Sequence, residues 1–186
     1  IQIAATPGGV RLYSRSGDDI SGAFPDLVDR IGFLAVLDGE LLVKRAEEVA
    51  PFNDLQQRLN RKVVTARMLE EFPAFVRLYD ILFDGTEDVR PLPWTERRAR
   101  LERFIDELDA GFFDLSALID APDFEALEGM RASARDSAIE GMMLKRRDSP
   151  YVAGRKGGLW YKWKRDPLTA DCVLMYAQRG SGKRSS

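Results

Sequence analysis

Short apolar runs of the strand type recur along the whole chain, and they limit the fold more than any other feature of the sequence. The longest runs from Phe75 to Phe83, and an Asp84-Gly85 turn ends it. Two shorter runs surround a Thr6-Pro7-Gly8-Gly9 turn, which predicts a β-hairpin over residues 1–14. Strands are also expected over residues 139–146, 159–164 and 171–179.

The apolar segments 34–37 and 41–43 flank Asp38-Gly39-Glu40. This pattern fits either a second hairpin or one strand with a bulge.

Helical patterns are fewer, and the clearest covers about residues 95–109, after two prolines. Its apolar positions have the i, i+3, i+4, i+7 spacing of a core-facing stripe, and they are Leu101, Phe104, Ile105 and Leu108. Shorter helices are expected over residues 24–30, 53–60 and 124–134. The predicted class is therefore α+β, with two antiparallel β-sheets flanked by helices.

The composition excludes several kinds of site. The 186 residues include no His and one Cys, so the sequence has no Ser-His-Asp or Cys-His nucleophile pair and no His-ligated metal. Cys172 lies in an apolar run, which predicts a buried cysteine, and a single cysteine fits a reducing, cytoplasmic location. No apolar run approaches the ~18 residues of a membrane span.

The net charge of −2 conceals an asymmetry. Residues 140–165 contain eight basic and two acidic side chains, a local charge of +6. Such a segment indicates a surface that meets polyanions, whereas the alternative is a solvated, charged hairpin. Aromatic residues interleaved with the cations favour contacts to phosphates and bases, and they are Tyr151, Trp160, Tyr161 and Trp163.

Two features of this basic segment suggest particular chemistry. Glu140 stands at the entry of an apolar run, where a carboxylate is costly unless it is paired or binds a metal; the alternative is a surface Glu at a strand end. Period-two alternation places Lys162 and Lys164 on one strand face. Two cations ~7 Å apart repel unless an anion such as a nucleotide phosphate lies between them. The alternative is an exposed edge strand that uses lysines against aggregation.

Three earlier residues are weaker candidates when each is taken alone. Tyr79 is either a stacking surface for a purine or a core tyrosine. Glu40 is a carboxylate embedded in an apolar segment, and Arg15 offers a guanidinium to a phosphate or to the next hairpin.

The order and spacing of these candidates carry more information than any one of them. The series resembles the motifs of covalent nucleotidyltransferases, and within them the adenylation domain of ATP-dependent DNA ligases, of the bacterial kind. The resemblance covers residues 1–165 and includes an Arg-rich helix after residue 91. The motifs are Tyr-Ser-Arg15-Ser-Gly-Asp-Asp, Leu-Asp-Gly-Glu40-Leu, Leu-Tyr79-Asp-Ile-Leu-Phe-Asp-Gly, Ile-Glu140-Gly-Met-Met-Leu-Lys and Trp-Tyr-Lys162-Trp-Lys164-Arg-Asp.

The resemblance implies an ATP-grasp-like nucleotidyltransferase fold with its nucleotide cleft between two sheets. It implies a lysine-AMP adduct, transfer of AMP to the 5′-phosphate at a nick, and sealing of the strand with release of AMP. By this resemblance Tyr79 would stack on adenine, Glu40 would contact the ribose, and Arg15 would lie by the ribose and the nick phosphate. Lys162 and Lys164 would neutralise the phosphates. Glu140, with Glu40, would hold Mg²⁺, which needs no His ligand.

The sequence departs from the family at both ends. The family's nucleophile lies in Lys-x-Asp-Gly-x-Arg, and none of the seven lysines is followed by x-Asp-Gly. We therefore expect residues 1–165 to be an adenylation domain that lacks its N-terminal motif, and a fragment that is inactive alone. Residues 166–186 are expected to be a linker and the first strand of a missing OB-fold domain. The tail around Gly182-Lys183 does not match a P-loop, because Arg184 replaces the required Ser or Thr.

Two other functions stay open. The same fold serves RNA ligases and GTP-using mRNA-capping enzymes, and a basic face would also suit a non-catalytic nucleic-acid-binding module. The ligase interpretation implies nicked double-stranded DNA and ATP as partners, a monomer, no membrane association, and a cytoplasmic role in DNA repair, replication or recombination.

Overall fold

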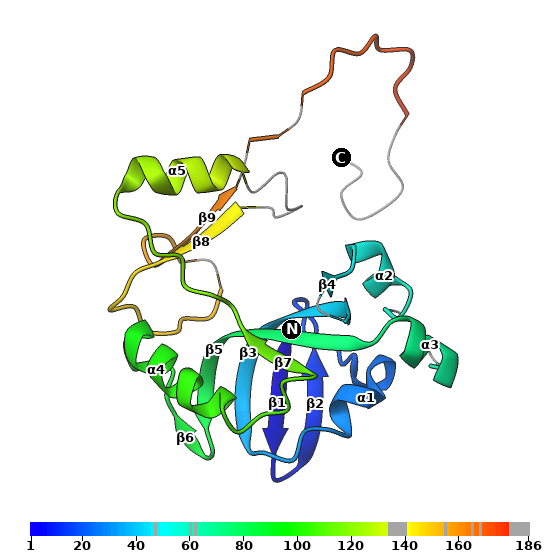
Figure 1. Cartoon of the computed structure of the whole chain (residues 1–186), viewed down its shortest axis with the longest axis vertical. Coiled ribbons are helices and arrows are strands. Elements are labelled where there is room, and N and C mark those ends of the chain that lie inside the picture. The colour runs from blue at the N-terminus through cyan, green and yellow to red at the C-terminus, as the bar shows by residue number, and fades with distance from the viewer. Residues whose placement is uncertain are drawn as a thin grey trace. The chain divides into compact units, whose positions relative to one another are not determined.

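The computed structural model describes residues 1–46, 48–59, 61, 63–133, 141–154, 156–164, 166–167 and 169–178. The chain divides into two compact units (Figure 1). The larger unit combines Ile1–Asp120 with Leu144–Tyr161, and the smaller unit combines Ala121–Met143 with Lys162–Ser186.

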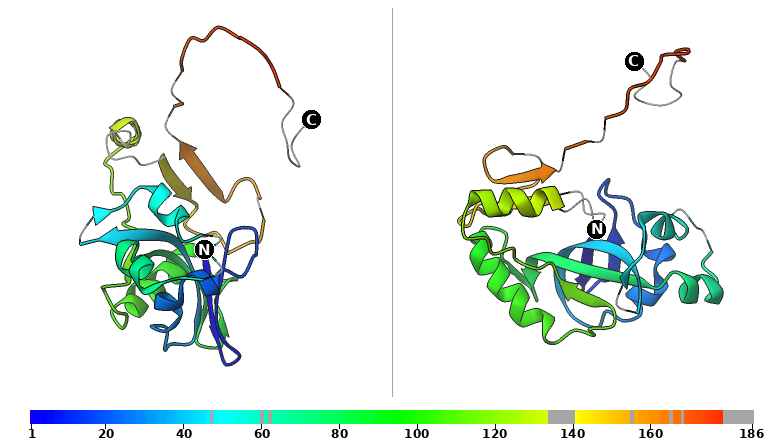
Figure 2. Two further views of the ribbon diagram at one scale, coloured as in Figure 1. Left: turned by 90° about the vertical axis from the view of Figure 1, so that its right-hand side faces the viewer. Right: turned by 45° about the horizontal axis from the view of Figure 1, so that its top comes forward.

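The larger unit is built on one curved sheet, which Figure 2 shows from two further directions. Its strands lie in the order β2-β1-β3-β5-β6, with β4 paired to β3 and β7 paired to β5. Their bounds are β1 Gln2–Thr6, β2 Gly9–Tyr13, β3 Ala35–Arg45, β4 Glu48–Val49, β5 Ala74–Asp84, β6 Glu87–Asp88 and β7 Phe113–Leu115.

Most of this sheet confirms the expectation from the sequence. β1 and β2 form the predicted antiparallel hairpin, and the Asp38-Gly39-Glu40 segment lies inside the single strand β3, which pairs with β1 and β5. The α+β class with antiparallel sheets is confirmed, and one parallel pairing is added to it, since β7 runs parallel to β5. A long connection that includes helix α4 precedes β7, and such a crossover permits parallel pairing.

The helices of the larger unit are short except for α4, Trp94–Ile105. The expected stripe is confirmed over Leu101, which is fully buried, and Phe104 and Ile105, which pack against the core, whereas the helix ends at Ile105 and Leu108 packs against the core from the segment after it. The others are a 3₁₀ turn at Ser21–Ala23, α1 Pro25–Val28, α2 Phe52–Gln56 and α3 Ala66–Glu71. The sequence analysis did not predict α3, although Thr65 caps it by accepting a hydrogen bond from the Met68 amide.

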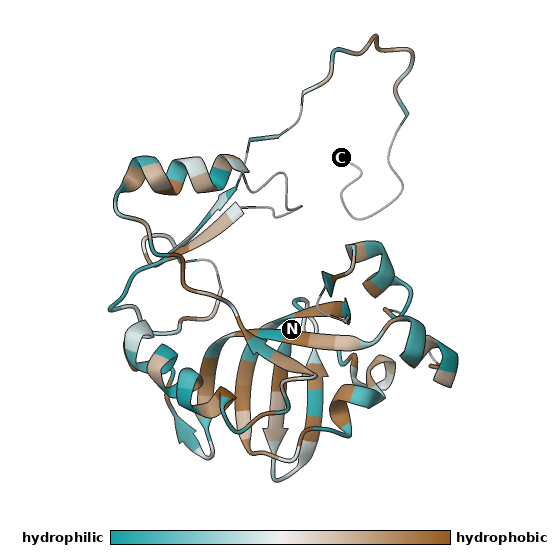
Figure 3. Cartoon of the chain, in the orientation of Figure 1, coloured by the Kyte–Doolittle hydropathy of each residue, from teal (hydrophilic) through white to brown (hydrophobic). Residues whose placement is uncertain are grey.

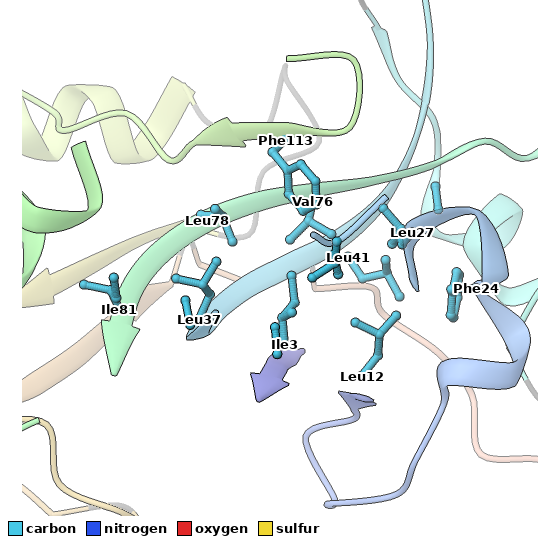
Figure 4. Close-up of a cluster of buried hydrophobic side chains, with 14 of the residues drawn as sticks. Ile3, Leu12, Phe24, Leu27, Leu37, Leu41, Val76, Leu78, Ile81 and Phe113 are labelled. Carbon is cyan, nitrogen blue, oxygen red and sulfur yellow. The ribbon is translucent and has the colours of Figure 1, made fainter. Parts of the chain in front are cut away.

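The hydrophobic core lies against the strands of this sheet. Hydrophobic residues recur along β1, β3 and β5 (Figure 3), and Figure 4 shows Ile3, Leu37 and Leu78 converging from these three strands. All three side chains are fully buried. The core therefore anchors the two central strands, β3 and β5, from which the candidate site is built.

Gly39 of β3 lies where a side chain would collide with β5. A Cβ atom there would lie 2.6 Å from Cγ1 of Val76 and 3.1 Å from the carbonyl oxygen of Arg77. The second of these is backbone, so it cannot rotate away, and any larger residue would push the strands apart.

Gly39→Ala is therefore expected to lower the free energy of unfolding by about 1–3 kcal/mol. Urea unfolding would measure this change, with Gly32→Ala as the control because a Cβ at Gly32 meets nothing within 4 Å. Equal unfolding midpoints for the two variants would contradict the steric interpretation.

The smaller unit contains helix α5, Phe124–Ser133, and parts of a two-stranded sheet formed by β8, Gly141–Lys145, and β9, Trp160–Lys164. The rings of Phe124 and Trp163 stack with centroids 5.0 Å apart, and the guanidinium of Arg131 lies 5.0 Å from the Trp163 ring. These contacts pack α5 onto β9.

The strand expected over residues 171–179 is wrong for the described residues 171–178, which contain neither helix nor strand. Cys172, expected in the core, is exposed. A strand takes its hydrogen bonds from a neighbouring strand, and no pairing to this segment occurs within the described part of the chain.

Candidate functional site

The candidate site is centred on a bulge between β3 and β5. Asp38 lies opposite Asp80, and the next rung joins Gly39 to Leu78, so Tyr79 is an extra residue on β5. A bulge redirects the side chain that it contains. As a result Tyr79 is half-buried, whereas Leu78 and Asp80 on either side of it are buried.

Asp80 forms a fully buried ion pair with Arg97 of α4. Nε of Arg97 lies 2.8 Å from Oδ1 and Nη2 lies 3.1 Å from Oδ2, and both side chains have no exposed surface. Nη1 of Arg97 donates to the carbonyl oxygens of Leu92 and Ser149. This bidentate geometry, with further acceptors, is what makes a buried pair tolerable.

Asp38, the other carboxylate of this rung, accepts two hydrogen bonds. The hydroxyl of Tyr151 donates to Oδ2 at 2.7 Å, and Nε2 of Gln2 donates to Oδ1 at 3.1 Å. Burial raises the pKa of the Asp38 carboxyl, and these two hydrogen bonds oppose the rise.

Lys145, at the end of β8, places its ammonium group among three aromatic rings. Nζ lies 4.6 Å from the Trp160 centroid, 4.9 Å from that of Tyr79 and 5.9 Å from that of Trp94. It also lies 3.8 Å from Oδ2 of Asp80, and only 11% of its side chain is exposed. Burial lowers the pKa of this lysine, and the charge of Asp80 opposes the change.

Three of the residues predicted from the sequence lie in the larger unit, where the pairing of β3 with β5 places Glu40 beside the Tyr79 bulge and Arg15 interacts electrostatically with Tyr79. Burial raises the pKa of the Tyr79 hydroxyl, and the charges of Asp38, Asp80 and Glu40 raise it further, while Arg15 lowers it. Glu40 and Arg15 are exposed, on β3 and in the turn after β2. The structure thus brings Arg15, Glu40 and Tyr79 into one electrostatic neighbourhood, with an aromatic ring, a cation and a carboxylate.

The remaining predicted residues are not placed in this neighbourhood. Lys162 and Lys164 are exposed on β9 and belong to the smaller unit, and Glu140 lies outside the described residues. Among the side chains that the structure describes, no group of three or more Cys, Asp or Glu residues is arranged to hold a metal ion. The metal-binding roles of Glu140 and Glu40 stay predictions.

The sequence analysis did not assign the buried polar residues beneath the site. Asp38 and Asp80 could have been found, because a carboxylate within an apolar strand segment indicates a buried polar contact. Arg97 sits on α4 among several arginines, and Lys145 and Tyr151 were grouped with the basic surface, so nothing in the pattern separated these three from their exposed neighbours.

Nothing in the described part of the chain is a helix both long and apolar enough to cross a lipid bilayer.

Comparison with known proteins places the chain in one family. Residues 1–164 match the model of the ATP dependent DNA ligase domain. The DNA ligase of Cenarchaeum symbiosum is 35% identical over 197 residues, covering 100% of this chain and 33% of that protein. A probable DNA ligase of Koribacter versatilis is 32% identical, covering 95% of this chain and 35% of that protein. The chain thus spans about one third of the length of these relatives.

The solved structures agree. The mycobacterial DNA ligase D complexed with ATP and MES superimposes with a TM-score of 0.66 at 26% identity, over 88% of this chain and 50% of that one. Chlorella virus DNA ligase-adenylate shares the fold, with a TM-score of 0.62 at 15% identity, over 88% of this chain and 58% of that one. The relatives include archaeal and bacterial proteins, so the bacterial assignment stays a prediction. The match over residues 1–164 shows that the chain belongs to the ATP-dependent DNA ligase domain family.

Proposed function

We propose that this chain forms the nucleotide-binding part of an ATP-dependent DNA ligase that seals nicks in double-stranded DNA. The observation that carries the proposal is the neighbourhood of Arg15, Glu40 and Tyr79 around the β3–β5 bulge, in a chain of this family. The half-buried ring of Tyr79 supplies a stacking surface for adenine, while Glu40 and Arg15 contact the ribose.

The reaction proceeds by three displacements at phosphorus. A lysine amine attacks the α-phosphorus of ATP, so that a P–N bond forms, pyrophosphate leaves and the amine loses a proton. An oxygen of the 5′-phosphate at the nick then attacks the same phosphorus, so that a P–O bond forms, the P–N bond breaks and the lysine amine leaves with a proton taken up from solvent. Finally the 3′-hydroxyl attacks the 5′-phosphorus, loses its proton and expels AMP. Catalysis of such steps depends mainly on positioning and on fixed positive charge, which we assign to Lys162 and Lys164.

The two carboxylates proposed as metal ligands suit Mg²⁺ in their chemistry. Glu40 is an exposed carboxylate, Glu140 of the sequence is the other proposed ligand, and carboxylate oxygens are ligands that Mg²⁺ prefers. The described residues hold no cluster of three ligands, so water and phosphate oxygens would complete the coordination. When bound, the ion would neutralise charge on the nucleotide phosphates.

None of the seven lysines lies in a Lys-x-Asp-Gly motif, so none of them is assigned as the attacking lysine. We therefore propose that the 186-residue chain binds ATP but forms no lysine-AMP adduct on its own. We further propose the domain boundary at residues 165/166, with the OB-fold domain after it, and a monomeric, cytoplasmic enzyme of DNA repair, replication or recombination.

Nucleotide selectivity tests the proposal. Isothermal titration of the chain is expected to show ATP binding that a tenfold excess of GTP does not displace, because the capping enzymes use GTP and DNA ligases use ATP. Preference for GTP would favour the capping interpretation instead.

A second experiment separates ligation from a non-catalytic role. A protein extended upstream to include the Lys-x-Asp-Gly motif should become labelled by α-³²P-ATP with Mg²⁺ and transfer the label to nicked DNA. Labelling with ATP but transfer only to nicked RNA would indicate an RNA ligase, and no labelling would indicate a non-catalytic nucleic-acid-binding module.

A further inference from the structure

The described residues 144–154 and 156–161 belong to the larger unit, and we call them the strap below. Its backbone is attached at several points. The carbonyl of Arg147 accepts from the Thr95 amide at 3.1 Å, and the amide of Tyr151 donates to the Arg90 carbonyl at 2.8 Å. Arg97 donates to the Ser149 carbonyl at 3.0 Å. The strap is therefore held against α4 and the segment before it.

Two side chains of the strap reach the paired carboxylates beside Tyr79, Asp38 and Asp80, which we call the Asp38–Asp80 rung. Asp38 and Asp80 lie directly opposite each other, and like charges at opposed positions of a sheet destabilise it. The strap supplies one partner to each carboxylate: the hydroxyl of Tyr151 donates a hydrogen bond to Asp38, and the ammonium group of Lys145 forms an ion pair with Asp80 at 3.8 Å. Both ends of this rung are thus bound by one segment.

Lys145 also acts directly on the aromatic ring that the bulge presents. Its Nζ lies over the Tyr79 ring, 4.9 Å from the centroid, and donates to the Tyr79 carbonyl oxygen at 3.4 Å. A cation held by Asp80 against one face of the ring resists tilting of the ring. The bulge frees Tyr79 from the regular strand register, so its orientation depends on such contacts.

We propose that Lys145 and Tyr151 are positioning residues that fix the Tyr79 ring in the plane on which the nucleotide base stacks. They act through Tyr79 and through the Asp38–Asp80 rung rather than by contacting the nucleotide. This inference rests on the proposed function, because it assumes that Tyr79 binds the base.

Titration of the chain with ATP tests the role of each residue. Lys145→Met is expected to weaken ATP binding about tenfold, because the cation on the ring and its ion pair are lost. Tyr151→Phe removes only the hydroxyl and is expected to weaken binding about fivefold. Lys145→Arg, which keeps a cation for the rings and for Asp80, should bind within about threefold of the wild type.

The controls remove the same groups elsewhere on the sheet. Lys44 lies 4.6 Å from the Phe75 ring, so Lys44→Met removes a cation–ring contact from the sheet without touching Tyr79. Tyr13→Phe removes a hydroxyl from β2. Both should bind ATP as the wild type does, at a temperature where all variants are folded by circular dichroism.

A double-mutant cycle distinguishes positioning from direct contact. In a Tyr79→Leu background, Lys145→Met should weaken ATP binding less than twofold further, because the ring on which it acts is gone. A full tenfold further loss would show that Lys145 contacts the nucleotide itself and would overturn the proposal. Lowered melting temperatures with unchanged ATP affinity in the two single variants would also overturn it, since that result indicates stability alone.

The outcomes for the wild type separate the two proposals. ATP binding by the wild type with unchanged affinity in Lys145→Met and Tyr151→Phe refutes the positioning role and leaves the proposed function intact. Absence of ATP binding by the wild type refutes the proposed function, and the inference falls with it.

Discussion

Arg97→Met is expected to lower the free energy of unfolding by about 3–5 kcal/mol. The substitution keeps an unbranched apolar stem but leaves the Asp80 carboxylate in the core without its bidentate partner, and both groups have no exposed surface. Removing one member of a buried pair costs far more than the pair contributes, because the remaining charge stays desolvated. Urea unfolding at neutral pH would measure the loss.

Arg100 provides the matched control on the same helix. Its guanidinium pairs with Glu87 at 2.7 Å, but the side chains are 24% and 58% exposed. Arg100→Met should therefore cost less than about 1 kcal/mol. Adding Asp80→Asn to Arg97→Met should recover part of the lost free energy of unfolding, because it removes the buried charge that has no partner. A loss for Arg97→Met no larger than that for Arg100→Met would contradict the account of the buried pair.

Lys162→Ala is expected to slow transfer of AMP by a factor on the order of 10²–10³ in a protein that includes the nucleophilic lysine. The amine of Lys162 is proposed to stabilise negative charge that develops on the phosphoryl oxygens, and a methyl group cannot replace it. Single-turnover labelling with α-³²P-ATP would measure the rate, with circular dichroism to verify the fold. Glu140→Ala should have a similar effect through the metal ion.

Lys44→Ala is the control for charge, since it removes one lysine from β3. Its rate should stay within about twofold of the wild type, as expected for a residue outside the catalytic steps. Unchanged turnover in both Lys162→Ala and Glu140→Ala would show that the roles assigned to these residues are wrong.

Local patterns were sufficient to predict most of the elements. The hairpin of β1 and β2, the long strand β5 and the stripe on α4 each arise from the spacing of apolar residues and from turn residues nearby. The order of motifs was also sufficient to indicate the family, which residues 1–164 confirm. These features depend on neighbours in the sequence, so the sequence alone determined them.

The tertiary structure decided which polar residues are buried and how Tyr79 is presented. The pattern around Asp38-Gly39-Glu40 allowed a bulge as one of two alternatives, but the residue that the bulge displaces, Tyr79, depends on the register between β3 and β5, strands separated by about thirty residues. Arg97 and Lys145 resemble their exposed neighbours in the sequence, yet Asp80 lies beside both. A buried charge is stabilised by a partner that is remote in the chain, and only folding brings that partner to it.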